Sequence, residues 1–548
     1  MNSKPTYLFL RLLAPFLGAV FLADASANEE WLINSQAEWS AALAGHTNLE
    51  VVDGSVVPTA HQASFTSVFK QFEDVRELDS IKFSQSAVWE NWEPIRFVQP
   101  NLSDAPVLLS MGPKNYWMFG RYNSVEKMQQ REASTNARKG ASNPYADYQL
   151  DSFVPEATTL EGFDMPLLTT PYPNQFTAPG GLEFPEQGYH GWQSKDMVNW
   201  VHHGSVTKGR AYLVTSAEMV GDHVYFYYDY PNDQDPHLVI DRDLTDGIAG
   251  EDLGMVFQDP SDGSDSAIIR GLDGKFHLIL EDWSPVNAST HAWDSPLAMH
   301  AVSDDGIQDF KILEPPVDER TTPTGQFAEY AHPHWHASDP KNYPGKPSPV
   351  DVPQHRIKAG DVVAFAQYEI HEPEQNAYGD WAAIAIGGQH YLFCDYDPVG
   401  GHGQKSMSVG LFTASSIDGP FEWCGHVGQG HPDPDIMFAE GRFYLATQTG
   451  SDFVSPGPWV ETVEVRVGVD TTNDGVVDEW SQWQAVSEQY DYIPGFAKQV
   501  AKTPAQMDLS GLPAGYGFQF EVRMTDTTEN DSKPILDQMT LSFAELKL

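Results

Sequence analysis

The chain has 548 residues with 77 acidic and 32 basic side chains, so its formal net charge is −45 and its isoelectric point is near 4.5. A nucleic-acid-binding protein needs a basic surface, and an anionic membrane would repel this chain, so both kinds of partner are excluded. Hydrophobic residues make up 41% of the sequence and aromatic residues 12%, which is enough for a large core and more than one domain.

The first 27 residues have the three parts of a secretory signal peptide. Lys4 and Arg11 are positively charged, an apolar run follows from Leu12 to Ala23, and Ala25-Ser26-Ala27 is a small-residue cleavage site. The apolar run is too short to span ~30 Å of hydrocarbon, which argues against a retained anchor. We therefore expect residues 1–27 to be removed and the mature protein to be secreted or periplasmic.

One pattern recurs five times between residues 99 and 485. In each copy an acidic residue precedes a short apolar strand, and a turn then leads into an aromatic-rich strand. A second hairpin follows most copies, so the complete repeat has four strands. In chain order the acidic residues are Asp104, Glu218, Asp265, Asp380, and Asp433 or Asp435. Four strands repeated five times predict an all-β fold with a five-bladed β-propeller, and the alternative is a generic β-sandwich.

The two ends of the chain contain strands that fit none of the five copies. We predict that residues 99–485 form the propeller, which is the catalytic domain. Residues 28–98 and 486–548 form either an accessory β-sandwich built from both ends or capping strands on the propeller edges. Long insertions at 123–188 and 314–378 are of the kind that line a functional face.

The two cysteines are expected to remain unpaired. Cys394 falls on the second strand of the predicted fourth blade and Cys424 on the fourth strand. Two strand spacings separate them by roughly 9.6 Å, whereas a disulfide needs Cα atoms within about 7 Å. We therefore predict two free, buried thiols.

The acidic residues of the five copies are the candidates for chemistry. The innermost strands of a propeller converge on a central channel, so acidic residues at their starts predict a ring of carboxylates at one mouth. Crowded like charges raise the pKa of some carboxyl groups and leave others ionised. One residue type can then supply both a general acid and a general base.

This arrangement resembles the five-bladed propeller glycoside hydrolases of families 43, 62, 32 and 117, over residues 100–485. The family 43 pattern implies that Asp104 is the general base, that Asp265 orients the general acid and tunes its pKa, and that Glu218 lies near the site. The general acid of that family is a glutamate, whereas this chain has Asp380 at the matching turn. The same resemblance implies inversion at the anomeric carbon.

The insertion before Asp380 offers further candidates. Family 117 enzymes are thought to use a histidine as the acid, a role that His332, His334 or His371 could take. Alternate histidines on a strand could also ligate a metal, or the segment could be a polar loop packed on Trp335. Candidates for sugar binding are Trp117, Glu329, His334, Trp335, Glu372, Trp381 and Asp433.

No cofactor is required by these assignments. The family 43 pattern places a blade-five histidine beside an ion in the channel. In this chain the histidine would be His431, and the ion would be a structural divalent cation such as calcium. The segment Asp470 to Asp478 also resembles a calcium loop, but position 481 is Ser where the loop needs a bidentate Glu. We predict a hairpin turn there.

The leading hypothesis is a secreted, exo-acting glycoside hydrolase that inverts and acts on oligosaccharides from plant or algal polysaccharides. One alternative is a non-catalytic carbohydrate-binding propeller, which would have equivalent shallow sites between blades. Another is a polysaccharide lyase on a propeller, with a Tyr or His base and a positive group to neutralise a uronate.

Overall fold

The computed structural model describes residues 29–86, 95–96, 102–122, 175–176, 188–197, 200–209, 212–230, 236–258, 265–281, 298–317, 377–397, 408–427, 433–447, 453–457, 463–526 and 534–546. These residues form 35 β-strands and one α-helix, as predicted for an all-β protein. Within these ranges, no helix is long and apolar enough to cross a bilayer. The predicted signal peptide, residues 1–27, lies outside them.

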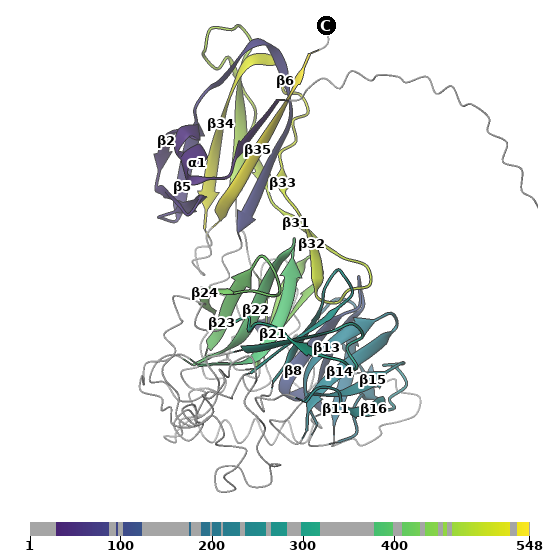
Figure 1. The fold of residues 1–548 in the computed structure, drawn as a ribbon. Coiled ribbons are helices and arrows are strands. Elements are labelled where there is room, and N and C mark those ends of the chain that lie inside the picture. Colours follow the sequence, from purple (N-terminus) through teal and green to yellow (C-terminus); the bar gives the residue numbers. More distant parts are fainter. Residues whose placement is uncertain are drawn as a thin grey trace, which may run out of the picture.

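Strands from both ends of the chain form one body, the upper one in Figure 1. Its twelve strands are β1 (Glu29–Ile33), β2 (Leu43–Thr47), β3 (Leu49–Val52), β4 (Ser55–Pro58), β5 (Gln62–Ser67), β6 (Lys70–Ser86), β28 (Val463–Asp470), β29 (Glu479–Trp480), β30 (Gln484–Val486), β33 (Ala505–Gln506), β34 (Gly515–Thr525) and β35 (Ile535–Glu545). Alternate side chains of β35 and β34 point into one core, so each strand buries one face. Strands from both ends of the chain therefore build one accessory β body with a shared core, which is called the sandwich below.

The single helix, α1 (Gln36–Ala42), begins with a capping box. The Glu38 N–H donates to Ser35 Oγ, and the Glu38 carboxylate accepts from the Asn34 N–H at 3.0 Å. Trp39 projects from the helix into the sandwich core, where its ring meets Phe65 edge to face at 6.0 Å. The helix therefore covers one part of the sandwich core.

Five smaller sheets form the lower body in Figure 1. The first blade holds β8 (Leu102–Ser110), β9 (Tyr116–Tyr122), β11 (Tyr189–Ser194), β12 (Trp200–Ser205) and β10 (Gln175–Phe176), and the second β13 (Leu213–Val220), β14 (His223–Asp229), β15 (Pro236–Asp241) and β16 (Glu251–Met255). The third holds β17 (Ala267–Arg270), β18 (Phe276–Glu281), β19 (Ala298–Ser303) and β20 (Lys311–Ile312), and the fourth β21 (Ala377–Ile386), β22 (Gln389–Asp397), β23 (Ser408–Ala414) and β24 (Glu422–Val427). The fifth holds β25 (Asp435–Ala439), β26 (Arg442–Thr447), β27 (Phe453–Gly457) and β7 (Ile95–Arg96).

The first strands of the five sheets form a closed ring. β8 contacts β13, β13 contacts β17, β17 contacts β21, β21 contacts β25, and β25 contacts β8 again. The five-bladed propeller predicted from the repeats is therefore confirmed. Strand β7 also ties the two ends of the propeller together. It precedes the first blade in the chain, yet it pairs with β27 as the outermost strand of the fifth blade.

The fifth blade is built from different strands than predicted. Val463–Asp470 had been assigned to it, but this strand, β28, pairs with β34 along its whole length in the sandwich. The third strand of the blade is β27 instead. The prediction was wrong because alternating Val residues fit any half-buried strand, and the pattern does not say which sheet buries them. The propeller thus ends before Val463 and not at residue 485.

A hairpin from the C-terminal part of the chain enters the propeller. It consists of β31 (Gln489–Tyr492) and β32 (Gln499–Thr503), and β32 pairs in parallel with the end of the inner strand β21. Figure 1 shows the hairpin between the two bodies. The sequence pattern predicts a place for this segment in the C-terminal β region and not in a blade.

The cysteines are free, as predicted. Cys394 lies on β22 and Cys424 on β24, with β23 between them. Cys394 is buried, but Cys424 is exposed, so the prediction of burial was wrong for Cys424. Among the described residues, β24 is the outermost strand of this blade.

Candidate functional site

Three aspartates stand at the starts of inner strands in the same strained backbone conformation. Asp265, Asp380 and Asp433 have φ values of 49°, 49° and 53°. Aspartate tolerates this left-handed region better than most residues, yet it remains uncommon. Strain repeated at the same place in three blades indicates that the surrounding structure holds these side chains in a required direction.

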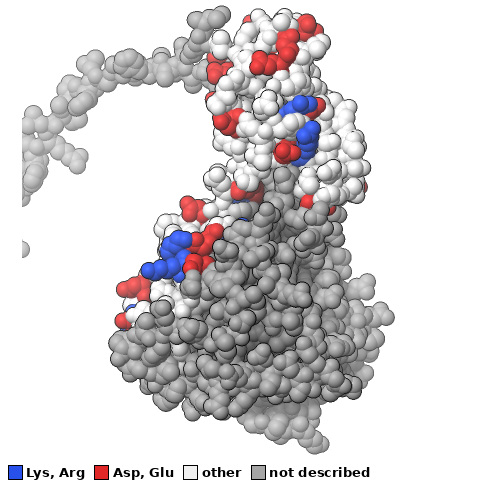
Figure 2. All heavy atoms as spheres, turned by 180° about the vertical axis from the view of Figure 1, so that it is seen from behind, with Lys and Arg blue, Asp and Glu red and all other residues white. Residues whose placement is uncertain are grey.

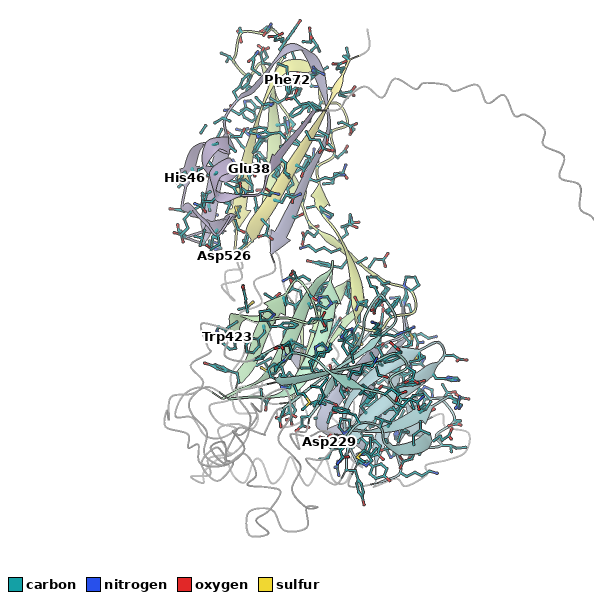
Figure 3. All side chains as sticks on the ribbon, viewed as in Figure 1. Glu38, His46, Phe72, Asp229, Trp423 and Asp526 are labelled. Atoms are coloured by element: carbon teal, nitrogen blue, oxygen red, sulfur yellow. The ribbon has the colours of Figure 1, made fainter. Side chains whose placement is uncertain are left out.

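Acidic residues at the ends of the second strands hold these turns. The Asp265 N–H donates to Asp229 Oδ2 at 2.9 Å, and the Asp433 N–H donates to Asp395 Oδ1 at 2.6 Å. In each case the acceptor belongs to the preceding blade, so one carboxylate fixes the start of the next inner strand. Asp229 lies at the end of the propeller far from the sandwich (Figure 3).

Five carboxyl groups meet at this end of the channel. Donor oxygens of Asp265, Glu281 and Asp380 lie within 4.8 Å of one another, and so do those of Asp380, Asp395 and Asp433. Asp380 belongs to both groups and is therefore the centre of the cluster. This confirms by geometry that Asp265, Asp380 and Asp433 come together, and it adds Glu281 and Asp395, which sequence analysis missed.

The environment of Asp380 favours its protonated form. Protein surrounds the carboxyl group closely, and this burial is the largest cause that raises its pKa well above the usual range. Repulsion from Asp265, and then from the other three carboxylates, raises the pKa further. The residue as a whole is partly exposed.

Several predicted site residues cannot be compared with this geometry. Asp104 lies on β8, but its side chain is outside the described residues. The remaining ones lie wholly outside them: Glu329, His332, His334, Trp335, His371, Glu372 and His431. Their roles therefore stay predictions.

Glu218 does not join the cluster. It is fully buried further along β13, where it accepts the N–H groups of Met219 at 2.9 Å and Arg270 at 3.2 Å. Its blade instead places Thr215 near the start of the inner strand, with Oγ1 3.0 Å from Ser266 Oγ. The prediction of an acidic residue in phase in all five blades was wrong for the second blade, because β13 starts earlier than its sequence pattern suggested.

A lysine from the hairpin lies beside Glu218 and Asp435. Lys498 is buried, with Nζ 3.8 Å from Asp435 Oδ1. Burial raises the pKa of both Glu218 and Asp435, while the Lys498 charge opposes that shift. Of the two blade-five candidates, Asp433 therefore belongs to the mouth and Asp435 to this buried ion pair.

The two tryptophans proposed for sugar binding lie in the core. Trp117 is stacked on Phe119, with ring centroids 5.9 Å apart and planes at 4°, and Trp381 packs against Phe412 at 5.8 Å. Both side chains are 2% exposed, so neither offers a face to a ligand. The prediction was wrong because both side chains belong to core clusters that pack one blade against its neighbour.

The loop from Asp470 to Asp478 is a hairpin turn, as predicted. Asp470 accepts N–H groups from Thr472, Asn473 and Gly475, and Asp478 accepts from Thr471. These bonds use the oxygens that a calcium ion would need. By contrast, the carboxylates around Asp380 offer the oxygen donors that hard divalent cations such as calcium prefer.

No family model matches the chain, and no curated protein matches its sequence. Solved structures similar to it include a thermostable family-43 glycoside hydrolase, at 10% identity over 77% of this chain and 98% of that one, with a TM-score of 0.35. The GH43_1 enzyme from Xanthomonas citri complexed with xylose is 12% identical over 71% and 92%, with a TM-score of 0.34. An exo-1,5-alpha-L-arabinanase from a bovine ruminal metagenomic library is 13% identical over 66% and 93%, with a TM-score of 0.32.

The chain is similar to family-43 glycoside hydrolases. At these identities and TM-scores the likeness says nothing about activity or substrate. The assignment of the fold rests on the closed ring of five inner strands, and the chemistry has to be inferred from the carboxylates themselves.

Proposed function

We propose that the protein is a secreted glycoside hydrolase that acts from chain ends on oligosaccharides of plant or algal polysaccharides. The observation that carries the proposal is Asp380, a carboxyl group with a raised pKa at the centre of four other carboxyl groups. A glycosidase needs a carboxylic acid that stays protonated near neutral pH beside a carboxylate that stays ionised.

Asp380 is the proposed general acid. It would protonate the glycosidic oxygen as the bond to the anomeric carbon breaks, and the cluster would then stabilise positive charge on the sugar ring. Asp265 has an oxygen within 4.8 Å of Asp380, closer than the roughly 6.5–9.5 Å between acid and base in inverting enzymes. This supports Asp265 as the residue that tunes the pKa of Asp380 and not as the base.

Asp104 remains the proposed general base. It lies at the start of β8, next in the ring to β25, which begins two residues after Asp433. If the reaction inverts, Asp104 would take a proton from the water that attacks the anomeric carbon while Asp380 protonates the leaving oxygen. The two roles predict different responses to substitution.

The hairpin supports action at chain ends. It contacts all five blades at the end of the channel opposite the carboxylates, through Tyr492, Phe496, Ala497, Lys498 and β32. A sugar chain therefore cannot thread through the channel past the carboxylates. A chain end that enters from the carboxylate end of the channel would meet Asp380 before it met the hairpin.

The test is Asp380→Asn, assayed on two kinds of substrate. Screening with neutral and sulfated oligosaccharides first identifies a sugar that is cleaved, and its aryl glycosides are then compared. General-acid catalysis contributes roughly 10²–10⁴-fold, so kcat/KM should fall by that factor on the natural oligosaccharide. The fall should be much smaller on a 2,4-dinitrophenyl glycoside, whose leaving group needs no proton.

Two further variants complete the test. Asp104→Asn should lower kcat/KM similarly on both substrates, because a base acts on water whatever the leaving group is. Asp304→Asn, at an exposed turn of the third blade, should behave as wild type. Equal losses on both substrates for Asp380→Asn would contradict its role as the acid, and an unsaturated product would identify a lyase instead.

A further inference from the structure

Three histidines and one aspartate gather between the third and fourth blades, away from the carboxylate cluster. His277 lies on β18, His300 on β19, and His390 on β22, while Asp418 lies in the turn between β23 and β24. One ligand atom each from His277, His300 and Asp418 lie within 4.8 Å of one another. None of these residues takes part in the proposed hydrolysis.

The central imidazole has an unused nitrogen that faces a carboxylate. His300 is 0% exposed, and its Nε2 is 3.0 Å from His277 Nδ1. Its Nδ1 is buried, has no hydrogen-bond partner among the described residues, and lies 4.0 Å from Asp418 Oδ1. That separation is too long for a hydrogen bond, and a small movement of the exposed Asp418 side chain would bring the two atoms to the roughly 3.4 Å that separates tetrahedral zinc ligands.

A second imidazole nitrogen is in the same condition. His390 Nδ1 is buried and also has no hydrogen-bond partner within the described ranges. His390 is close enough to His277 and Asp418 for both to affect its pKa. Leaving a buried polar atom without a hydrogen bond is unfavourable, so two such imidazole nitrogens in this region indicate that a bound group satisfies them.

The first blade provides a comparison within the same molecule. His190 Nδ1 lies 3.0 Å from His202 Nε2, with ring centroids 5.2 Å apart, the same values as for His277 and His300. Among the described residues, however, no carboxylate gathers with His190 and His202 in this way. A histidine pair is thus a building element of this fold, and Asp418 is what sets the second pair apart.

The charges also suit a metal ion. Burial lowers the pKa of His277 and His390, and it lowers that of His300 to about 3, so all three rings are neutral at pH 7. Neutral imidazole is the form that binds a metal, and no proton has to be displaced. The Asp418 side chain is 63% exposed, which leaves a path from solvent.

We propose that His277, His300 and Asp418 bind one divalent transition-metal ion of the Zn²⁺ type between the third and fourth blades. Nitrogen donors with one carboxylate favour Zn²⁺, Co²⁺ or Ni²⁺ over Ca²⁺ and Mg²⁺. The ion would join two blades that also pack through apolar contacts between β17, β18 and β21. Its role would be structural.

The test uses the full mature protein, stripped with a chelator and titrated with Co²⁺ and Zn²⁺. Co²⁺ bound by nitrogen ligands in a four-coordinate site gives strong visible absorption, and Zn²⁺ should displace it at one equivalent. Asp418→Asn should weaken the binding of Co²⁺ and of Zn²⁺ at least tenfold, because the substitution removes the charged ligand. Zn²⁺ should also raise the unfolding temperature of the wild type more than that of the variant.

Three controls locate the ion. Asp222→Asn changes an exposed aspartate beside His223 in another blade turn and should bind as wild type. Asp380→Asn should also keep the visible Co²⁺ spectrum, which separates this site from the carboxylate cluster. His300→Gln should abolish the spectrum if it folds, and Asp418→Asn tests the site if it does not. Wild-type protein without the spectrum at micromolar Co²⁺, or an unchanged spectrum in Asp418→Asn, would overturn the proposal.

Discussion

At the scale of single residues, the mouth of the propeller shows how much a repeat pattern can reveal. Asp265, Asp380 and Asp433 were all predicted from their position before an apolar strand, and the structure brings them together. Glu281 and Asp395 were missed, because they end their strands and belong to the blade before the one they serve. Adjacency between blades is a property of the closed ring and leaves no local trace in the sequence.

Asp241 carries a prediction about pH. It ends β15, its Oδ2 is buried without a hydrogen-bond partner among the described residues, and burial raises its pKa from 3.8 to about 7. The folded protein therefore holds this proton more tightly than the unfolded chain. Protonated Asp241 therefore stabilises the folded protein fully below the unfolded pKa near 4. This contribution to the free energy of unfolding is roughly 4 kcal/mol at most, and it is lost as the pH rises toward about 7.

Asp241→Asn should therefore stabilise the protein at pH 8. The amide oxygen can still accept the Asp243 N–H, which now donates to Asp241 Oδ1 at 2.9 Å, and no charge has to be buried. Thermal unfolding should show a higher midpoint for the variant at pH 8 and a smaller gain at pH 5.5. Asp304→Asn, which is exposed, serves as the control. A gain that does not depend on pH would mean that the carboxylate is not the source.

At the scale of elements, the hairpin β31–β32 is the feature that sequence reasoning could not place. Its residues look like an ordinary amphipathic hairpin, and nothing in them specifies that β32 should pair with β21. The five blades could be counted because each buries its strands through a local pattern. The hairpin is held by the pairing of β32 with β21, which joins segments far apart in the sequence. Its position therefore depends on the shape of the folded channel.

Lys498 gives the hairpin an electrostatic role that can be measured. Lys498→Met would leave Glu218 and Asp435 buried without a nearby cation, and breaking a buried pair in this way costs about 3–5 kcal/mol. The pKa of both carboxyl groups should rise further, so the loss should be greater at pH 8 than at pH 5.5. Differential scanning calorimetry at the two pH values measures it.

The matched controls for this prediction are one lysine and one double variant. Lys311→Met, at an exposed position of β20, should leave the unfolding temperature unchanged. Lys498→Met combined with Asp435→Asn should recover part of the loss, because one buried charge is removed with its partner. A single variant as stable as the Lys311 control would show that Lys498 does not neutralise these carboxylates.

At the scale of the whole molecule, the negative charge is spread and not concentrated. Acidic side chains are scattered over the described part of the sandwich, with basic ones among them (Figure 2). Only Asp104 and the five carboxyl groups of the cluster around Asp380 are proposed for catalysis. A net negative surface charge disfavours self-association, and salt in the medium screens the repulsion between like charges.

The chain passes between the two bodies several times, which predicts that they unfold together. It leaves the sandwich after β6, contributes β7 to the fifth blade, completes the propeller, returns through β28 and enters the channel with β31 and β32 before finishing in β34 and β35. Lys502, on β32, also donates to the Gln85 carbonyl at 2.5 Å and lies 3.0 Å from Glu488 Oε1. Neither body can lose its strands without disturbing the other.

Phe543→Ala tests this coupling from the side far from the site. Phe543 is fully buried in the sandwich, with its ring 4.8 Å from Phe72 and 5.2 Å from Phe518. Removing the ring should lower the free energy of unfolding by about 3–5 kcal/mol. Calorimetry should then show the whole unfolding transition at a lower temperature, and hydrolytic activity should be lost over the same temperature range. Two separate transitions, of which only one moves, would mean that the sandwich is an independent domain and that the hairpin does not transmit its stability to the propeller.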